Sequence, residues 1–129
     1  MNLVELLSKK SGFVSLGGAT EREVQDAEKT LGVVFAKDFR EYLLCYGAAS
    51  YVGHEFTGIC DDKGTNVVTV TIEERQFNEI PGDWYVIERA DIEGLVYWQS
   101  SNGKVYVTVP NEKPRKKADS FIGLIKEGK

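Results

Sequence analysis

The sequence of 129 residues contains a single histidine, His54, and only two cysteines, Cys45 and Cys60. One histidine excludes a His-rich metal cluster, and the two cysteines do not form a CxxC pair. We expect Cys45 on a helix and the other two residues on a strand, so the sequence predicts no metal site. Both cysteines are interpreted as reduced thiols, and Cys45, which follows Leu44 in an apolar helix, as a small buried hydrophobic residue.

The motifs of common catalytic and nucleotide-binding sites are also missing from the sequence. No serine lies in a Gly-x-Ser-x-Gly elbow, and one histidine would have to act as the base for any of them. Gly12 and Gly17 have the spacing of a phosphate loop, but Gly18-Ala19 stand where Lys-Ser/Thr is required. We therefore predict that the protein is not an enzyme and has no cofactor.

Long apolar runs are absent too. Residues 1–12 carry Glu5, Lys9 and Lys10, which is not typical of a signal peptide, and no later segment is long enough to span a membrane. The hydrophobic fraction of 42% and the charged fraction of 28% are ordinary for a globular protein. We expect one domain over residues 1–129, located in the cytoplasm and without a membrane partner.

Charge is distributed unevenly around a net value of −4. Residues 55–93 hold ten acidic and three basic residues, whereas residues 94–129 hold three acidic and seven basic ones. An acidic middle third repels phosphates, so no nucleic-acid partner is expected. Two interpretations of the acidic segment remain: a solvated face, or a surface that binds a basic protein.

Helix-end signals are clear in the first half of the chain. Asn2 has the spacing of a helix cap and predicts a helix over residues 3–9. Thr20 and Glu23 form a capping box, which predicts a helix that ends at Gly32. The apolar face of a further helix, which Gly47 ends, consists of Phe39, Tyr42, Leu43 and Tyr46.

Period-two alternation predicts the strands. Residues 53–60 alternate and are expected to form the first strand of a sheet. Three further strands are predicted at 84–88, 95–99 and 104–109, and their short connections make an antiparallel meander. Asn102-Gly103 predicts a type I′ hairpin turn between the last two.

The remaining segments are less uniform. Residues 67–78 carry alternating β-branched residues, typical of a strand, together with apolar residues at helical spacing. Residues 111–117 are expected to be a basic loop, after which Asp119 or Ser120 caps a last helix. Helices before and after a run of strands predict an α+β fold, with a mostly antiparallel sheet and helices packed mainly on one face.

Neighbouring residues of a strand point to opposite faces of the sheet. One of Tyr97 and Trp98 is therefore expected to face away from the packed helices. Such an outward aromatic side chain would be an exposed patch and an anchor for a binding partner.

A series of residues in two parts of the chain has the order and spacing of a family motif: Glu28, Gly32, Phe35, Asp38, Tyr42, Tyr46, Gly47, Gly53, Glu55, Gly58, Asp119, Ser120 and Phe121. This series resembles the SUKH superfamily, the Smi/Knr-type proteins that include many bacterial immunity proteins against polymorphic toxins. The sequence departs from the family at Ala36, where proline is usual, and at Ile122-Gly123, where acidic residues are commoner. The resemblance implies a SUKH-like α+β fold, with a helix over residues 67–78.

The same resemblance implies a function. It indicates an immunity protein (antitoxin) that binds and neutralises a cognate toxin, with a nuclease as the expected class. The alternative is an intracellular regulatory module that binds a host protein, and an enzyme is a third, disfavoured hypothesis. From charge and resemblance together, we expect a basic toxin to be captured by acidic residues of the segment 55–93: Glu55, Asp61, Asp62, Glu73, Glu74 and Asp83.

Two motif carboxylates have competing interpretations. Glu28 and Glu55 are either partner-binding groups or structural ones. In the structural interpretation, Glu28 bonds the backbone of the next helix and Glu55 lies on a sheet edge. We favour the structural role for Glu28 and leave both roles open for Glu55.

The cysteine pattern gives a first testable prediction. Protein purified without reductant and then denatured should show two free thiols in a colorimetric thiol assay, because no disulfide framework is present. A single native Cys45–Cys60 bond in protein from a reducing cytosol would contradict it.

Overall fold

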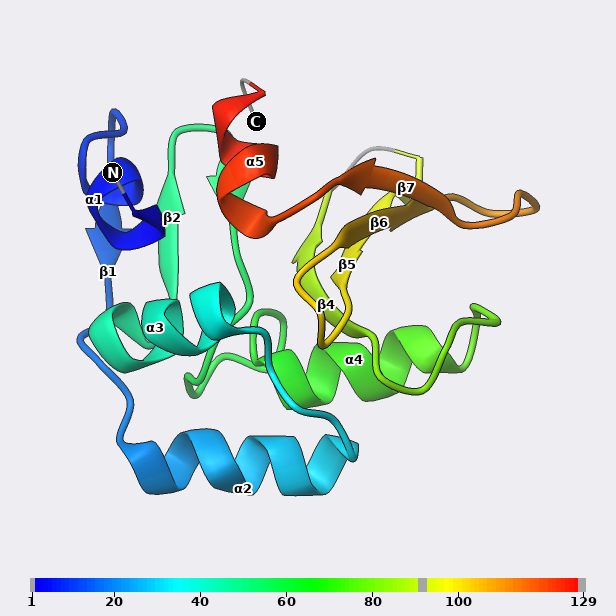
Figure 1. The fold of residues 1–129 in the computed structure, drawn as a ribbon, viewed down its shortest axis with the longest axis horizontal. Helices are drawn as coiled ribbons and strands as arrows, with labels where there is room; N and C mark the ends of the chain where they lie inside the picture. The colour runs from blue at the N-terminus through cyan, green and yellow to red at the C-terminus, as the bar shows by residue number, and fades with distance from the viewer. Residues whose placement is uncertain (1, 91–92, 128–129) are drawn as a thin grey trace.

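The computed structural model describes residues 2–90 and 93–127, and within them it has five helices and two antiparallel sheets (Figure 1). The predicted α+β class is confirmed. In chain order the elements are α1 (Leu3–Ser8), β1 (Val14–Ser15), α2 (Glu21–Leu31), α3 (Lys37–Tyr46), β2 (Ala49–Tyr51), β3 (His54–Glu55), α4 (Val67–Arg75), β4 (Tyr85–Arg89), β5 (Val96–Gln99), β6 (Val105–Thr108), β7 (Arg115–Ala118) and α5 (Phe121–Lys126).

The helix ends follow the capping signals of the sequence. Asn2 accepts a hydrogen bond from the Glu5 backbone N–H, and Thr20 and Glu23 form the reciprocal capping box. Gly32 ends α2 with a φ of 71°, a left-handed conformation that favours glycine. Of the two candidates for the last cap, Ser120 makes the bond, from the Gly123 N–H at 2.9 Å.

Helix α4 occupies the segment with two competing patterns, so the helix implied by family resemblance is confirmed, over Val67–Arg75. The Asn66 side chain caps it by accepting from the N–H groups of Val68 and Thr69. Thr71 Oγ1 accepts a hydrogen bond from the Val86 N–H at 3.0 Å, which ties the helix to β4. Cap and tertiary packing together outweigh the β-propensity of the segment.

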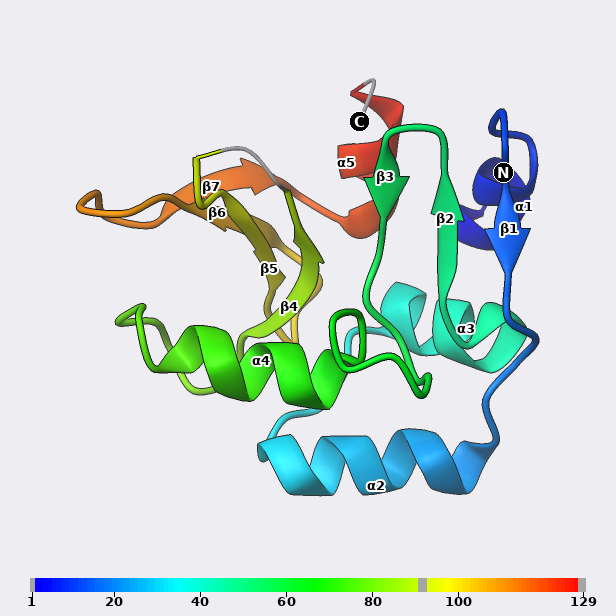
Figure 2. The same ribbon diagram turned by 180° about the vertical axis from the view of Figure 1, so that it is seen from behind.

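The sheets have the orders β1-β2-β3 and β4-β5-β6-β7. They meet where Phe56 bridges Glu88 and the Thr57 N–H donates to the Ile87 carbonyl at 2.9 Å. Figure 2 shows the first sheet beside the more strongly curved second one. The curved meander has one strand more than the predicted three.

Two predictions for the sheets need correction, the strand over 53–60 and the loop over 111–117. The strand expected over 53–60 is regular only at His54–Glu55, and it is preceded by β1 and β2. The loop expected over 111–117 contains β7. Both β1 and β7 carry mostly exposed side chains, so they lack the alternating burial that makes a strand visible in a sequence. The basic residues of β7 suit an edge strand, because charge discourages pairing with another chain.

The β5–β6 turn also differs from the prediction. A type I′ turn needs a positive φ at both central residues, but Asn102 is not in the left-handed region. Instead the loop has three residues, with Ser100 N–H bonded to Lys104 O at 3.0 Å and Gly103 at φ 94°. Asn102 Oδ1 accepts from the Lys104 N–H, which stabilises this longer loop.

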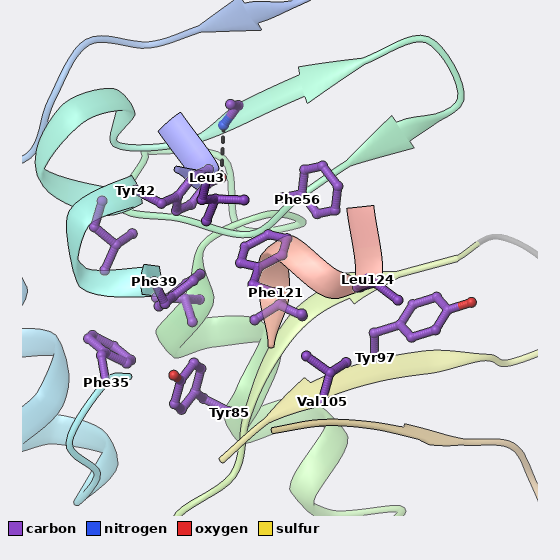
Figure 3. Close-up of a cluster of buried hydrophobic side chains, with 14 of the residues drawn as sticks. Leu3, Phe35, Phe39, Tyr42, Phe56, Tyr85, Tyr97, Val105, Phe121 and Leu124 are labelled. Atoms are coloured by element: carbon purple, nitrogen blue, oxygen red, sulfur yellow. Dashed lines mark hydrogen bonds between the residues drawn. The ribbon is translucent and has the colours of Figure 1, made fainter. Parts of the chain in front are cut away.

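The larger core cluster lies between α3, α5 and one face of the second sheet (Figure 3). Its centre is a set of fully buried aromatic rings, Phe39, Tyr42, Tyr85 and Phe121. Phe39 stacks on Tyr42 with ring centres 5.4 Å apart. Helix α1 and the apolar face of α2 complete this cluster.

A second, smaller cluster covers the opposite face, where Val70 of α4 packs against Trp84, Val86 and Trp98. Trp98 is fully buried and Tyr97 is 6% exposed, so the expected outward aromatic at one of these positions was wrong. The reason is that α4 covers the face that the sequence left open. The exposed aromatic side chain is instead Phe77, just after α4, at 80%.

Cys45 likewise differs from the expectation, because it is exposed. It follows the buried Leu43 by two residues, which is about 200° around an α-helix, so the two side chains lie on opposite sides. Neither Cys45 nor Cys60 forms a disulfide. In the part of the chain that the structure describes, no helix has the length and apolarity needed to cross a bilayer.

Replacement of Leu43 by alanine tests the core assignment. Leu43 is fully buried, so the free energy of unfolding should fall by about 2–5 kcal/mol in a urea melt. Val34→Ala is the control, because Val34 is 67% exposed and its loss should change the stability by less than about 0.5 kcal/mol. Equal effects of the two substitutions would contradict the assignment.

Candidate functional site

A groove of about 1340 Å³ runs between β3, the end of α4, the end of β4 and the start of β5. Figure 2 shows β3, β4 and α4 from this side. Three of the side chains that line it are acidic, Glu55, Glu74 and Glu88, and one is basic, Arg89. Phe77, Leu95 and Pro110 add apolar surface at its far end. We call this feature the β3–α4 groove.

Glu88 is the most buried of these carboxylates, at 4% exposure. Its Oε2 lies 2.8 Å from Nδ1 of His54, which belongs to the neighbouring strand β3. The Tyr51 ring packs against His54 with centres 4.9 Å apart. Burial, and then the charge of Glu88, raise the pKa of Tyr51 to about 12, so its phenol keeps its proton at neutral pH.

Arg89 organises the other side of the groove. Its Nη1 donates to Glu73 at 3.2 Å and to Glu74 at 3.3 Å, and its Nη2 donates to the Gly64 carbonyl at 3.2 Å. The guanidinium therefore joins α4, β4 and the loop before α4. It offsets only part of the negative charge that these elements place here.

The family-motif residues lie mainly outside the groove. Glu28 Oε2 accepts from the Phe35 backbone N–H at 2.8 Å, and its Oε1 accepts from Arg40 at 3.1 Å. Arg40 also forms an ion pair with Glu21. This carboxylate therefore fixes the connector between α2 and α3, and the backbone N–H that it binds lies two residues before α3 rather than within that helix.

Asp38 joins the two parts of the motif. Its Oδ2 accepts from the Phe121 N–H at 3.1 Å, and its Oδ1 accepts from Gln99 Nε2 at 3.0 Å. The Tyr85 hydroxyl donates to Gln99 Oε1 and accepts from the Ala36 N–H, both at 2.8 Å. Burial strongly raises the pKa of Tyr85, which keeps this donor protonated. These hydrogen bonds form one continuous polar path through the core.

Tyr42 makes the corresponding link to the first sheet. Its hydroxyl donates to the Thr57 carbonyl at 2.8 Å and accepts from the Ala49 N–H at 2.9 Å. Gly58 lies so close to Gly47 that a Cβ on it would be 2.0 Å from the Gly47 carbonyl oxygen. These contacts require a tyrosine hydroxyl at position 42 and a residue without a side chain at position 58.

The other motif residues are also structural. Phe35 packs edge-on against Tyr85 with ring centres 4.8 Å apart, and the Tyr46 hydroxyl donates to the Val4 carbonyl at 2.7 Å. Gly53, at φ 84°, lies in the turn between β2 and β3. Asp119 is exposed and pairs with Lys116, in front of the α5 cap.

Comparison with known families supports the motif assignment. The SUKH_5 family model, described as SMI1-KNR4 cell-wall, matches residues 1–127. The chain belongs to this family. The resemblance noted in the sequence is thereby confirmed. Members of the SUKH family are generally non-catalytic immunity or binding proteins. No curated protein matches the chain.

In this SUKH domain, the predicted partner-binding residues divide into two groups. Glu55 and Glu74 line the groove, Glu73 shares Arg89 with Glu74, and Asp61 and Asp62 are exposed in the adjoining loop. Asp83 lies elsewhere: its Oδ2 accepts from the Ser101 N–H at 3.2 Å, at the other end of β4 and β5. Asp83 is therefore the one of the six predicted residues that lies away from the groove.

Sequence reasoning missed the other residues of the groove, Tyr51, His54, Phe77, Glu88 and Arg89. An acidic residue within the apolar strand β4 was an available signal for Glu88, because a buried carboxylate needs partners. The exposure of Phe77 had no comparable signal. Among residues 2–90 and 93–127, no three His, Cys, Asp or Glu side chains are placed to hold a metal ion together.

The Asp38 contacts give a testable prediction for this SUKH domain. Asp38→Ala should lower the free energy of unfolding by about 1–3 kcal/mol, because the Phe121 N–H loses its acceptor and Gln99 Nε2 keeps only its bond to the Gly103 carbonyl. Asp26→Ala, on the exposed face of α2, is the matched control and should change it by less than about 0.5 kcal/mol. A chemical denaturation series measures both, and a silent Asp38→Ala would show that the bonds do not stabilise the fold.

Proposed function

We propose that this protein is an immunity protein that binds a cognate toxin, a nuclease being the expected class, and neutralises it by protein–protein contact in the cytoplasm. The family match over residues 1–127 carries this proposal, because it places the chain among SUKH proteins. Neutralisation by occupancy needs no catalytic residue. It needs a preformed surface complementary to the toxin.

Charge supports a basic toxin as the partner. A cleft that binds phosphate groups is built from positive charge, and a negative surface is complementary to it. Residues 55–93 carry ten acidic residues against three basic ones. Five of the six predicted partner-binding acids lie in the β3–α4 groove or in the elements around it.

A regulatory protein-binding module of the Smi/Knr type is the second candidate. The matching family is described as SMI1-KNR4 cell-wall, which names the Smi/Knr branch of the superfamily. Such a module uses the same kind of binding surface but a host protein as partner. A neighbouring gene for a large protein with a toxin-like carboxy-terminal domain distinguishes the two, since only the immunity role requires it.

The immunity role predicts that association with that toxin domain depends on salt. The on-rate in surface-binding kinetics should fall by about tenfold or more as salt rises from about 0.05 to 0.5 M, because screening shortens the electrostatic field to about 8 Å at 0.15 M. Asp61→Lys with Asp62→Lys should lower the on-rate more than it raises the off-rate.

Asp83→Lys is the matched control, because Asp83 lies at the other end of β4 and β5. It should slow association less than the paired reversal. A salt-independent on-rate together with a silent paired reversal would reject electrostatic capture. Failure of the wild-type protein to bind or protect against the toxin would reject the immunity role itself.

A further inference from the structure

We propose that the β3–α4 groove is the place where a basic side chain of the protein partner binds, and that Phe77 contacts the apolar residue next to it. This inference rests on the proposed function for the identity of the partner. It adds the site and the chemistry of the bound segment, an arginine or lysine flanked by apolar residues.

The first argument is charge. Glu55, Glu74 and Glu88 enter the groove from β3, α4 and β4, and Arg89 is the one basic residue among the described residues of its lining. Glu55 is exposed, while Glu88 is almost completely buried and lies beside His54. With His54 neutral the lining therefore has a formal charge of −2. A cation from outside the chain would reduce the repulsion between these carboxylates.

The second argument is an unsatisfied polar group. Tyr51 lines the groove and is only 7% exposed, and its hydroxyl has no hydrogen-bond partner among the residues described. Buried hydroxyls are nearly always hydrogen-bonded, so this one indicates a group that residues 2–90 and 93–127 do not supply. A guanidinium or ammonium group bound next to Glu88 would donate a hydrogen bond to the Tyr51 hydroxyl oxygen. Lys10 Nζ already lies 5.7 Å from the centre of the Tyr51 ring, and the Tyr97 ring is a second aromatic group in the lining.

The third argument is the apolar end of the groove. Phe77 is 80% exposed, the most exposed of the large hydrophobic side chains, and it borders the groove together with Leu95 and Pro110. An exposed aromatic ring beside a charged groove has the composition of an interface anchor. A partner segment that combines one cation with flanking apolar side chains matches both parts of the groove.

A peptide titration tests the site without any toxin. The probe is acetyl-Leu-Arg-Leu-amide, added to the ¹⁵N-labelled full chain, and the control peptide carries citrulline, which has the shape of arginine without its charge. Amide shifts should concentrate at Glu55, Phe77, Arg89 and Leu95. Affinity should be about two- to fivefold weaker for the citrulline peptide, and for Glu55→Gln or Phe77→Ala protein with the arginine peptide.

Asp26→Asn and Val34→Ala, at exposed positions outside the groove, are the matched controls and should bind the arginine peptide as the wild type does. Both groove substitutions are at exposed side chains, and unchanged spectra of the free variants verify their folding. Shifts scattered over other acidic residues, no shifts in the groove, or equal binding of both peptides would overturn the proposal. Toxin binding that is intact in Glu55→Gln and Phe77→Ala would also overturn the site, while leaving the immunity role in place.

Discussion

Asp38 accepts one hydrogen bond from the backbone of a residue 83 positions away and another from Gln99. Through Gln99 and the Tyr85 hydroxyl, the start of α3, β4, the β5–β6 turn and the start of α5 are held in one polar path. Each group in a buried path of this kind must find its partner, because an unsatisfied one costs free energy. This requirement fixes how the helices lie on the second sheet, and with it the position of β4 beside β3.

The family motif describes the scaffold rather than a partner surface. Glu28, Asp38 and Tyr42 each bond backbone groups of other elements, and Gly47 and Gly58 allow two backbones to approach. Two motif residues, Gly53 and Glu55, also line the β3–α4 groove. A scaffold specified in this way leaves the surrounding surface free to carry the charges that a particular partner requires, which is consistent with a family of binding proteins.

The groove exists because elements from different parts of the chain end beside one another. Helix α4 packs on β4 through Thr71 and Val70, and the Phe56–Glu88 bridge brings β3 to the same strand. Three carboxylates then line one groove, in which Arg89 bonds Glu74 and His54 lies beside Glu88. The same packing that buries Trp98 leaves Phe77 exposed at the rim.

The sequence alone determined the features that depend on near neighbours. The caps at Asn2 and Thr20, the end of α2 at Gly32, the apolar face of α3 and the strands β4 to β6 all follow from local hydrogen bonding and periodicity. The hydrogen bond between the Glu28 carboxylate and the backbone could also be predicted, since its acceptor and donor are only seven residues apart in the sequence. For α4, local propensity favoured a strand, and family resemblance supplied the helix.

Only the tertiary structure decided the rest. β1 and β7 are strands because a neighbour pairs with their backbones, not because of their side chains. Trp98 is buried because α4 covers its face, and Asp83 lies at the opposite end of β4 from the other predicted acids. The groove joins residues 51, 74 and 88, and no pattern in the sequence links positions that meet only after long-range packing.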